Sequence, residues 1–191
     1  MASPSADAVG VVVAGGTVRG FLTGVMVAAS SGILIKGNRF TQNREGVFLN
    51  GSSANTVKEN VAWQNQLRGI MIRPSLSGVQ STQNLVTENI LIDNPSGILL
   101  VGQPGNTLKE NTIRGSTVAG IDLSGPGASG NLLKESTLAF SAAGVKFSPG
   151  WTGNGIVENR IALNACGVQG PADGNTFKEN SFVANGLDSC S

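Results

Sequence analysis

The sequence predicts an all-β solenoid, a right-handed parallel β-helix of about seven coils of 22–24 residues. Two columns of repeated residues and the composition support this prediction. Segments between the repeats are too rich in Gly, Asn, Val and Ile for helices. The first column is a glycine followed by a β-branched or aliphatic residue, at Gly24, Gly46, Gly69, Gly97, Gly120, Gly144 and Gly167. The second reads Asn, any residue, an aliphatic or aromatic residue, any residue, Glu, then Asn or Ser, and starts at Asn55, Asn84, Asn106, Asn131, Asn154 and Asn175.

Short alternating runs within each unit predict the strands. Runs such as 69–72 and 111–113 are too short to be stable alone, but they form continuous parallel sheets when coils stack at about 4.8 Å. The repeated Asn predicts a ladder of side-chain amides, in which each amide bonds to the copies in neighbouring coils. Three columns are expected to fill the bore: Val47, Leu49, Ile70, Ile72, Ile98, Leu100, Ile121, Leu123, Val145 and Phe147; Val57, Val86, Leu108, Leu133, Ile156 and Phe177; and Phe40, Ala62, Leu91, Ile113, Leu138, Ile161 and Phe182.

Length and charge indicate one domain over residues 1–191. We expect residues 1–15 to be a partial first coil or an N-terminal extension, and residues 186–191 to be a C-terminal tail or cap. The net charge is +1 without long runs of either sign, so nucleic acid and anionic membranes are not expected partners. No run approaches the roughly 18 apolar residues that span a bilayer.

The repeat resembles that of the pectin-lyase-like right-handed β-helix superfamily, especially its repeat-rich branch of extracytoplasmic carbohydrate-binding and sugar-hydrolysing proteins. It is also similar to the periplasmic accessory proteins of copper-enzyme maturation. The resemblance covers roughly residues 16–185 and rests on the two columns. It implies the fold and a polysaccharide or protein ligand, but it is a weak indicator of activity.

The sequence offers few side chains suited to catalysis. The sequence contains no His and no Tyr, so two common acid–base side chains are missing and the catalytic His motifs of alginate epimerases and polygalacturonases have no counterpart. The best acidic grouping is Asp122 beside Lys146, one coil apart, with Arg114 nearby; such a pair is more often a surface ion pair. Neither a cofactor nor a metal site is predicted, because no His, Cys or Asp cluster is present.

A regular charged column also argues against a metal site. Six glutamates, most of them preceded by Lys, recur once per coil, and the Lys row is expected to compensate their repulsion in a solvated zipper of charge. Single carboxylates at strand spacing do not supply the six to eight oxygens that calcium prefers. These glutamates are Glu59, Glu88, Glu110, Glu135, Glu158 and Glu179.

Two groups of apolar residues are predicted to point outward. Met26, Phe48, Met71 and Leu99 occupy one outward column that continues with Asp122, Lys146 and Gln169, and Val61, Trp63, Ile90 and Ile92 flank inward residues of another strand. Exposed apolar patches of this kind usually have a function. Three explanations remain open. A loop at 74–83 covers one patch; copies self-associate through the stripe, or a segment outside this chain packs on it; or a ligand binds there, with Trp63 as a sugar-stacking platform.

Cys166 and Cys190 are the only cysteines and lie 24 residues, about one coil, apart. This spacing favours a disulfide, and hence an oxidising compartment, over two free thiols. The leading hypothesis is a secreted or periplasmic, non-catalytic β-helix module that recognises a glycan or protein partner and forms a homo-oligomer. The alternative is a polysaccharide lyase or hydrolase with a non-standard acidic site at Asp122, Lys146 and Arg114. An ice-binding solenoid fits less well, because outward Thr recurs irregularly.

Overall fold

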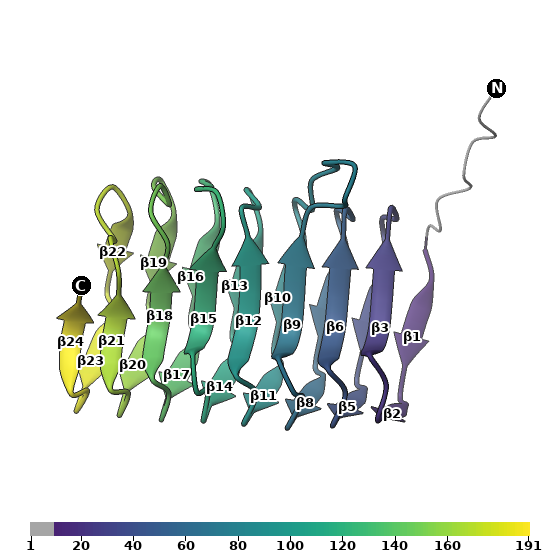
Figure 1. Cartoon of the computed structure of the whole chain (residues 1–191), viewed down its shortest axis with the longest axis horizontal. Coiled ribbons are helices and arrows are strands. Elements are labelled where there is room, and N and C mark those ends of the chain that lie inside the picture. The colour runs from purple at the N-terminus through teal and green to yellow at the C-terminus, as the bar shows by residue number, and fades with distance from the viewer. Residues whose placement is uncertain (1–9) are drawn as a thin grey trace.

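The computed structural model describes residues 10–191, which form a parallel β-helix of eight coils (Figure 1). The sequence predicted about seven. The eighth coil has no glycine in the repeat position, which holds Asp188 instead. Residues 187–190, expected in a tail or cap, form strand β24 of that coil. Residues 12–14 form β1 of the first coil, and residues 1–9 lie outside the described part of the chain.

Each coil contributes one strand to each of three eight-stranded parallel sheets. The first sheet contains β1 Val12–Ala14, β4 Leu34–Lys36, β7 Thr56–Lys58, β10 Leu85–Thr87, β13 Thr107–Lys109, β16 Leu132–Lys134, β19 Gly155–Val157 and β22 Thr176–Lys178. The second sheet contains β2 Thr17–Arg19, β5 Arg39–Thr41, β8 Val61–Trp63, β11 Ile90–Ile92, β14 Thr112–Arg114, β17 Thr137–Ala139, β20 Arg160–Ala162 and β23 Ser181–Val183.

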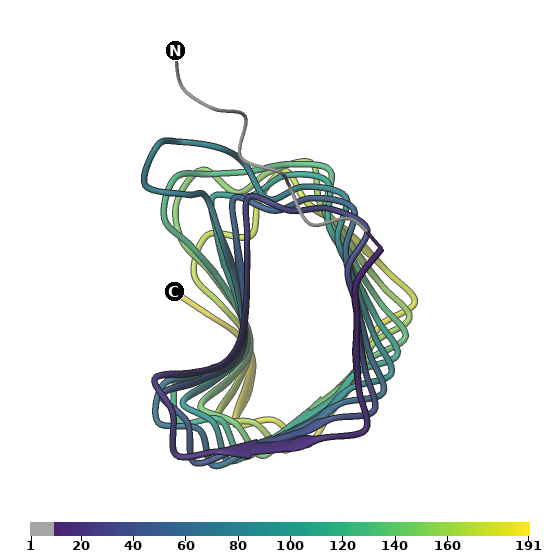
Figure 2. The ribbon, with the colours of Figure 1, turned by 90° about the vertical axis from the view of Figure 1, so that its right-hand side faces the viewer.

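The third sheet has the longer strands. It contains β3 Thr23–Ala28, β6 Glu45–Asn50, β9 Arg68–Arg73, β12 Ser96–Val101, β15 Ala119–Ser124, β18 Ala143–Phe147, β21 Cys166–Gln169 and β24 Leu187–Cys190. Viewed along the solenoid axis, this sheet curves inward, while the loops at one end of its strands and the corner at the other end project beyond it (Figure 2). We call its outward-facing side the concave face.

The bore is filled as the alternation predicted. Every residue of the three predicted columns is buried except Phe177 and Phe182. These two belong to the eighth coil, and no further strand covers them in the described part of the chain. Phe177 is therefore 38% exposed, whereas Ile156, in the same column one coil earlier, is 0% exposed.

Amide ladders hold the corners between the sheets. Asn60 is typical: its Oδ1 accepts the backbone N–H of Asn38, and its Nδ2 donates to the carbonyl of Ile35 and to Oδ1 of Asn89. The two predicted Asn columns both form such ladders. A third ladder, which the sequence did not predict, runs in two parts, because the Ser116 hydroxyl has no partner. The first part contains Asn43, Asn65 and Asn94, and the second contains Ser116, Ser141, Asn164 and Asn185.

The residue that precedes a ladder Asn is commonly in the left-handed region. All six glutamates of the charged column lie there, with φ between 52° and 57°. A left-handed non-glycine residue is unfavourable, and the hydrogen-bonded ladder residue that follows it offsets that cost. The glutamates are thus fixed as corner residues whose side chains point to solvent.

Candidate functional site

The central column of the concave face is assembled as predicted. Strand register places Met26, Phe48, Met71 and Leu99 on successive coils, and Asp122 follows Leu99 and pairs with Lys146. The column changes from apolar to polar between the fourth and fifth coils.

The apolar part is not the exposed stripe that the sequence predicted. Met26 is 58% exposed and Phe48 is half-buried, but Met71 and Leu99 are only 6% and 5% exposed. Inward curvature of the sheet accounts for this, because neighbouring outward side chains converge on a concave surface (Figure 2). Self-association therefore gains little from Met71 and Leu99. A lysine at position 99 would bury a charge rather than remove an interface.

Asp122 is the buried acid of this face. It is 9% exposed, and its Oδ1 has no hydrogen-bond partner. Burial raises the pKa of the carboxyl above its ordinary value, and the positive charges of Lys146 and Arg68 together with the Ser96 hydroxyl only partly oppose this effect. A buried polar atom without a partner is unusual and calls for a functional explanation.

The cations around Asp122 differ from those expected. Lys146 is half-buried on the neighbouring strand. Arg114 ends β14 and belongs to the second sheet, so it is not part of this group, because a corner at 115–118 separates the two strands. Arg68 takes its place, and its Nη1 also lies 3.0 Å from Oε1 of Glu45.

Other polar groups extend the concave face towards the first coils. The guanidinium carbon of Arg73 lies 5.8 Å from the centroid of the Phe48 ring, a cation–π contact. Arg73 pairs in register with Asn50, whose Oδ1 is also buried without a partner. Positive charge, an aromatic ring and two unpartnered oxygens thus occur on one side of one sheet.

The second apolar group lies on the second sheet. Val61 pairs with Ile90, and Trp63 pairs with Ile92. Ile90 is 43% exposed and the other three are half-buried. Arg39 covers Trp63 at 5.5 Å from the ring centroid, so the indole is only partly available for stacking. The loop at 74–83 contacts the corner at Gly51 and lies away from this sheet.

The charged column forms the expected zipper except at Glu88, which makes no ion pair among residues 10–191. Six ion pairs join Lys and Glu side chains along one corner, for example Lys134 with Glu135 at 3.1 Å and with Glu158 at 3.5 Å. The hydrogen bond from Lys134 is the main reason that the pKa of Glu135 is lowered. In residues 10–191, no three His, Cys, Asp or Glu side chains are grouped so as to hold a metal ion.

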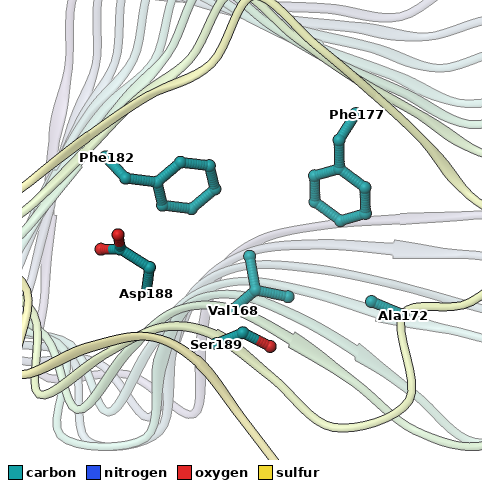
Figure 3. A pocket seen from close by; sticks show the side chains of 6 residues that line it. All are labelled: Val168, Ala172, Phe177, Phe182, Asp188 and Ser189. Carbon is teal, nitrogen blue, oxygen red and sulfur yellow. The ribbon is translucent and has the colours of Figure 1, made fainter.

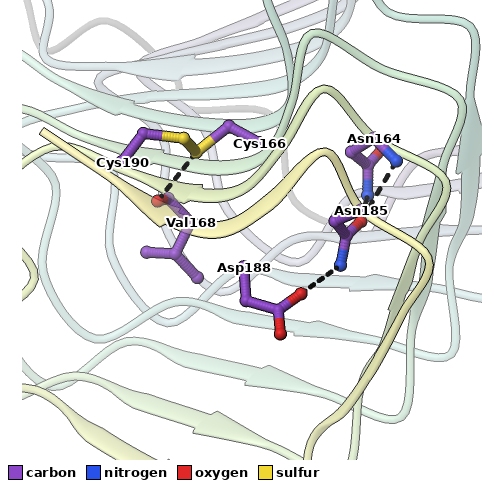
Figure 4. Close-up of a disulfide and its surroundings, with 6 residues drawn as sticks. All are labelled: Asn164, Cys166, Val168, Asn185, Asp188 and Cys190. Carbon is purple, nitrogen blue, oxygen red and sulfur yellow. Dashed lines mark hydrogen bonds between the residues drawn. A yellow bond between two sulfur atoms is a disulfide. The ribbon is translucent and has the colours of Figure 1, made fainter.

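The predicted disulfide is present. Cys166 and Cys190 are bonded, with their Cα atoms 6.2 Å apart (Figure 4). Together with Ala119 and Ala143 they form a small apolar cluster outside the main core. The bond fixes β24 to the preceding coil.

A cavity of about 280 Å³ opens at the C-terminal end of the bore. The rings of Phe177 and Phe182 project into it, and Val168, Ala172, Asp188 and Ser189 complete its lining (Figure 3). This apolar cavity was not predicted, because the sequence pattern places both phenylalanines in the core. The described residues contain no helix of the length and apolarity that a membrane span requires.

Fold and site together define an all-β solenoid with one inward-curving face, whose central column is apolar over the first four coils and polar after them. The chain belongs to the right-handed β-helix region family, whose sequence profile matches residues 6–138. The predicted resemblance to the pectin-lyase-like superfamily is thus confirmed for the fold.

Two solved structures of similar fold come from Azotobacter vinelandii. They are the A-modules of the mannuronan C-5 epimerases AlgE6 and AlgE4, each with a TM-score of 0.80 and 17% identity. The alignments cover 96% and 95% of this chain but 55% of each epimerase module, so the chain spans about half their length. A comparison with curated protein sequences gives no match.

Proposed function

We propose that this chain is an extracytoplasmic, non-catalytic module that binds a polysaccharide along its concave face. The observation that carries the proposal is Asp122, a buried carboxyl whose Oδ1 has no partner and which pairs in register with Lys146. A sugar hydroxyl can donate to this oxygen once a covering side chain moves aside, because Oδ1 has no exposed surface in the free protein. The polysaccharide class is suggested by the mannuronan epimerase modules of similar fold.

The strand spacing suits a linear polymer. Parallel strands repeat at about 4.8 Å, so a ligand that runs along the axis meets one residue of the central column on every coil. Phe48 with Arg73 offers a partly exposed ring for stacking at the N-terminal part, and Lys146 offers a cation at the C-terminal part. The disulfide supports an oxidising location.

Binding without turnover is the expected result of a panel of neutral and anionic polysaccharides, tested by calorimetry and by analysis of released products. Asp122→Asn should weaken binding on the order of tenfold, because 1.4 kcal/mol corresponds to a factor of ten. Asp173→Asn is the matched control, since Asp173 is exposed in the turn between β21 and β22. Equal binding by the parent and Asp122→Asn would contradict the proposal.

One observation favours a second candidate, a carbohydrate-active enzyme. Burial raises the pKa of the Asp122 carboxyl, as in many general acids, and Lys146 lies beside it. Sugar release by the parent that is lost in Asp122→Asn would establish this candidate and exclude the non-catalytic one. Lys146→Met would then show whether the cation takes part.

A further inference from the structure

The seven repeat glycines leave room for the next coil. A Cβ atom added at any of them would lie within 3.0 Å of a carbonyl oxygen in the following coil, a distance that real Cβ atoms essentially never show. None of these glycines has a positive φ. Glycine is therefore required by the close approach of two coils and not by backbone conformation.

Asp188 occupies the same position in the eighth coil. Strand register pairs Cys166 with Leu187 and Val168 with Ser189, which places Asp188 opposite Gly167. A Cβ at Gly167 would meet the carbonyl oxygen of Asp188. Asp188 itself carries a Cβ, so a ninth coil in the same register would bring its own carbonyl oxygen onto that atom.

The Asp188 carboxylate also ends an amide ladder. In the preceding coil, Asn164 Nδ2 donates to Asn185 Oδ1 at 3.1 Å. In the last coil, Asn185 Nδ2 donates to Oδ1 of Asp188 at 3.1 Å (Figure 4). The carboxylate thus replaces the acceptor that a further coil would have supplied.

The end that Asp188 protects is otherwise suited to association. Strands β22, β23 and β24 are the edges of their sheets, and Phe177 and Phe182 line an apolar cavity. Eight of the fourteen exposed large hydrophobic residues in the described part of the chain lie in the first and last coils: Val11, Val12, Phe21, Leu22, Met26, Phe177, Val183 and Leu187.

The first coil of a second copy is the natural candidate for this end. It has the same cross-section, and its inward Val13, Val18 and Val25 are small and only partly buried, so they would face the larger phenylalanines. The first coil, residues 10–28, contains Arg19 and no acid, whereas residues 171–191 contain three acids, Asp188 included, and one lysine. Shape and charge would both favour head-to-tail stacking, which generates open chains of copies.

We propose that Asp188 is a stop residue that prevents the C-terminal coil from stacking on the first coil of another copy. It does so because its Cβ fills the space that a following coil needs and because its carboxylate satisfies the last ladder amide. Unprotected sheet edges are a recognised route to aggregation, and proteins commonly block them with a charged residue.

Three substitutions of Asp188 distinguish the effect of its Cβ atom from the effect of its carboxylate. Asp188→Gly restores the repeat glycine and should give species of at least twice the parent mass in size-exclusion chromatography with light scattering, increasing with concentration. Asp188→Ala keeps the Cβ without the charge, and Asp188→Asn keeps both the Cβ and an acceptor; both should elute with the parent. Electron microscopy of Asp188→Gly should show linear arrays.

Two outcomes would overturn the proposal. One is an Asp188→Gly protein that keeps the parent mass while folded, as judged by circular dichroism and an intact disulfide. The other is association of Asp188→Ala to the same extent as Asp188→Gly. A separate variant in the middle of the solenoid, Gly144→Ala, tests whether a Cβ atom at the repeat position is incompatible with the next coil, because this Cβ would meet the carbonyl oxygen of Gly167. A melting temperature equal to that of the parent would refute the premise.

Discussion

Acidic and lysine side chains are neighbours at two places in this solenoid, within one coil at the charged corner and on adjacent coils at the concave face, with opposite effects on the acid. Along the charged corner, Lys134 contacts Glu135, and the pKa of the glutamate is lowered. On the concave face, Asp122 lies beside Lys146, yet the pKa of the aspartate is raised. The difference is burial. The glutamate remains in solvent, whereas Asp122 has lost most of its hydration without gaining a hydrogen bond to Oδ1.

This comparison shows that a repeated pair of residue types does not specify an electrostatic outcome. In a parallel β-helix, each outward position is defined by the curvature of its sheet as well as by its column. A flat or convex corner leaves charges hydrated, so that they stabilise each other weakly. A concave face desolvates them, so that an unpaired charge there becomes costly.

The largest effect is expected when the burial around Asp122 is removed. Leu99→Ala should lower the free energy of unfolding by about 2–5 kcal/mol, as for other buried leucines, because Leu99 is 5% exposed and adjacent to Asp122 in register. Met26→Ala, in the same column but 58% exposed, is the control and should cost less than about 0.5 kcal/mol. Urea titrations of both variants measure the difference. Equal losses of unfolding free energy would mean that burial does not determine how much each residue of the column contributes to stability.

A smaller effect of known sign is expected for Asp122 itself. Its folded pKa is raised, so its contribution to stability is fully present below the ordinary aspartate pKa and is lost as the pH rises through the folded value. Asp122→Asn should therefore raise the free energy of unfolding at pH 7 on the order of 1 kcal/mol. The gain should vanish near pH 3, where both side chains are neutral.

Unfolding curves of the parent and Asp122→Asn at several pH values test this sign. Asp173→Asn serves as the exposed control and should follow the parent throughout. A loss of stability at pH 7 in Asp122→Asn would indicate that Lys146 and Arg68 outweigh burial.

The smallest effect is expected at the charged corner, and its pH dependence is the reverse. The lowered pKa of Glu135 means that its stabilisation is present above the ordinary glutamate pKa and is lost as the pH falls through the folded value. Glu135→Gln should lower the melting temperature slightly at pH 7 and not at all in about 1 M salt, where exposed charges are screened.

Glu88→Gln is the matched control for Glu135→Gln. Glu88 has the same left-handed backbone, with φ of 57°, but makes no ion pair within 4.0 Å among residues 10–191. The Glu88→Gln variant should have the same melting temperature as the parent at either salt concentration. An equal loss in both glutamine variants would point to the corner backbone rather than to the ion pair.

The repeat made most of the fold predictable, because period, core and ladder all derive from the same spacing. The third ladder was not predicted, because serine replaces asparagine at Ser116 and Ser141 and because no Lys–Glu pair precedes its residues. The eighth coil was missed because Asp188 interrupts the glycine column. Sequence alone could pair Asp122 with Lys146, but it could not reveal the curvature that buries Asp122 and Leu99, nor the corner that separates Arg114 from them.

The extra residues of the longest coil show how such a protein can grow. The loop at 74–83 projects outside the common cross-section (Figure 2), while the strands before and after it keep their register with both neighbours. Duplication of a whole coil would equally preserve every corner, since each ladder rung recognises only the rungs beside it. The length of the concave face is therefore a quantity that evolution, or an engineer, can change in steps of one coil.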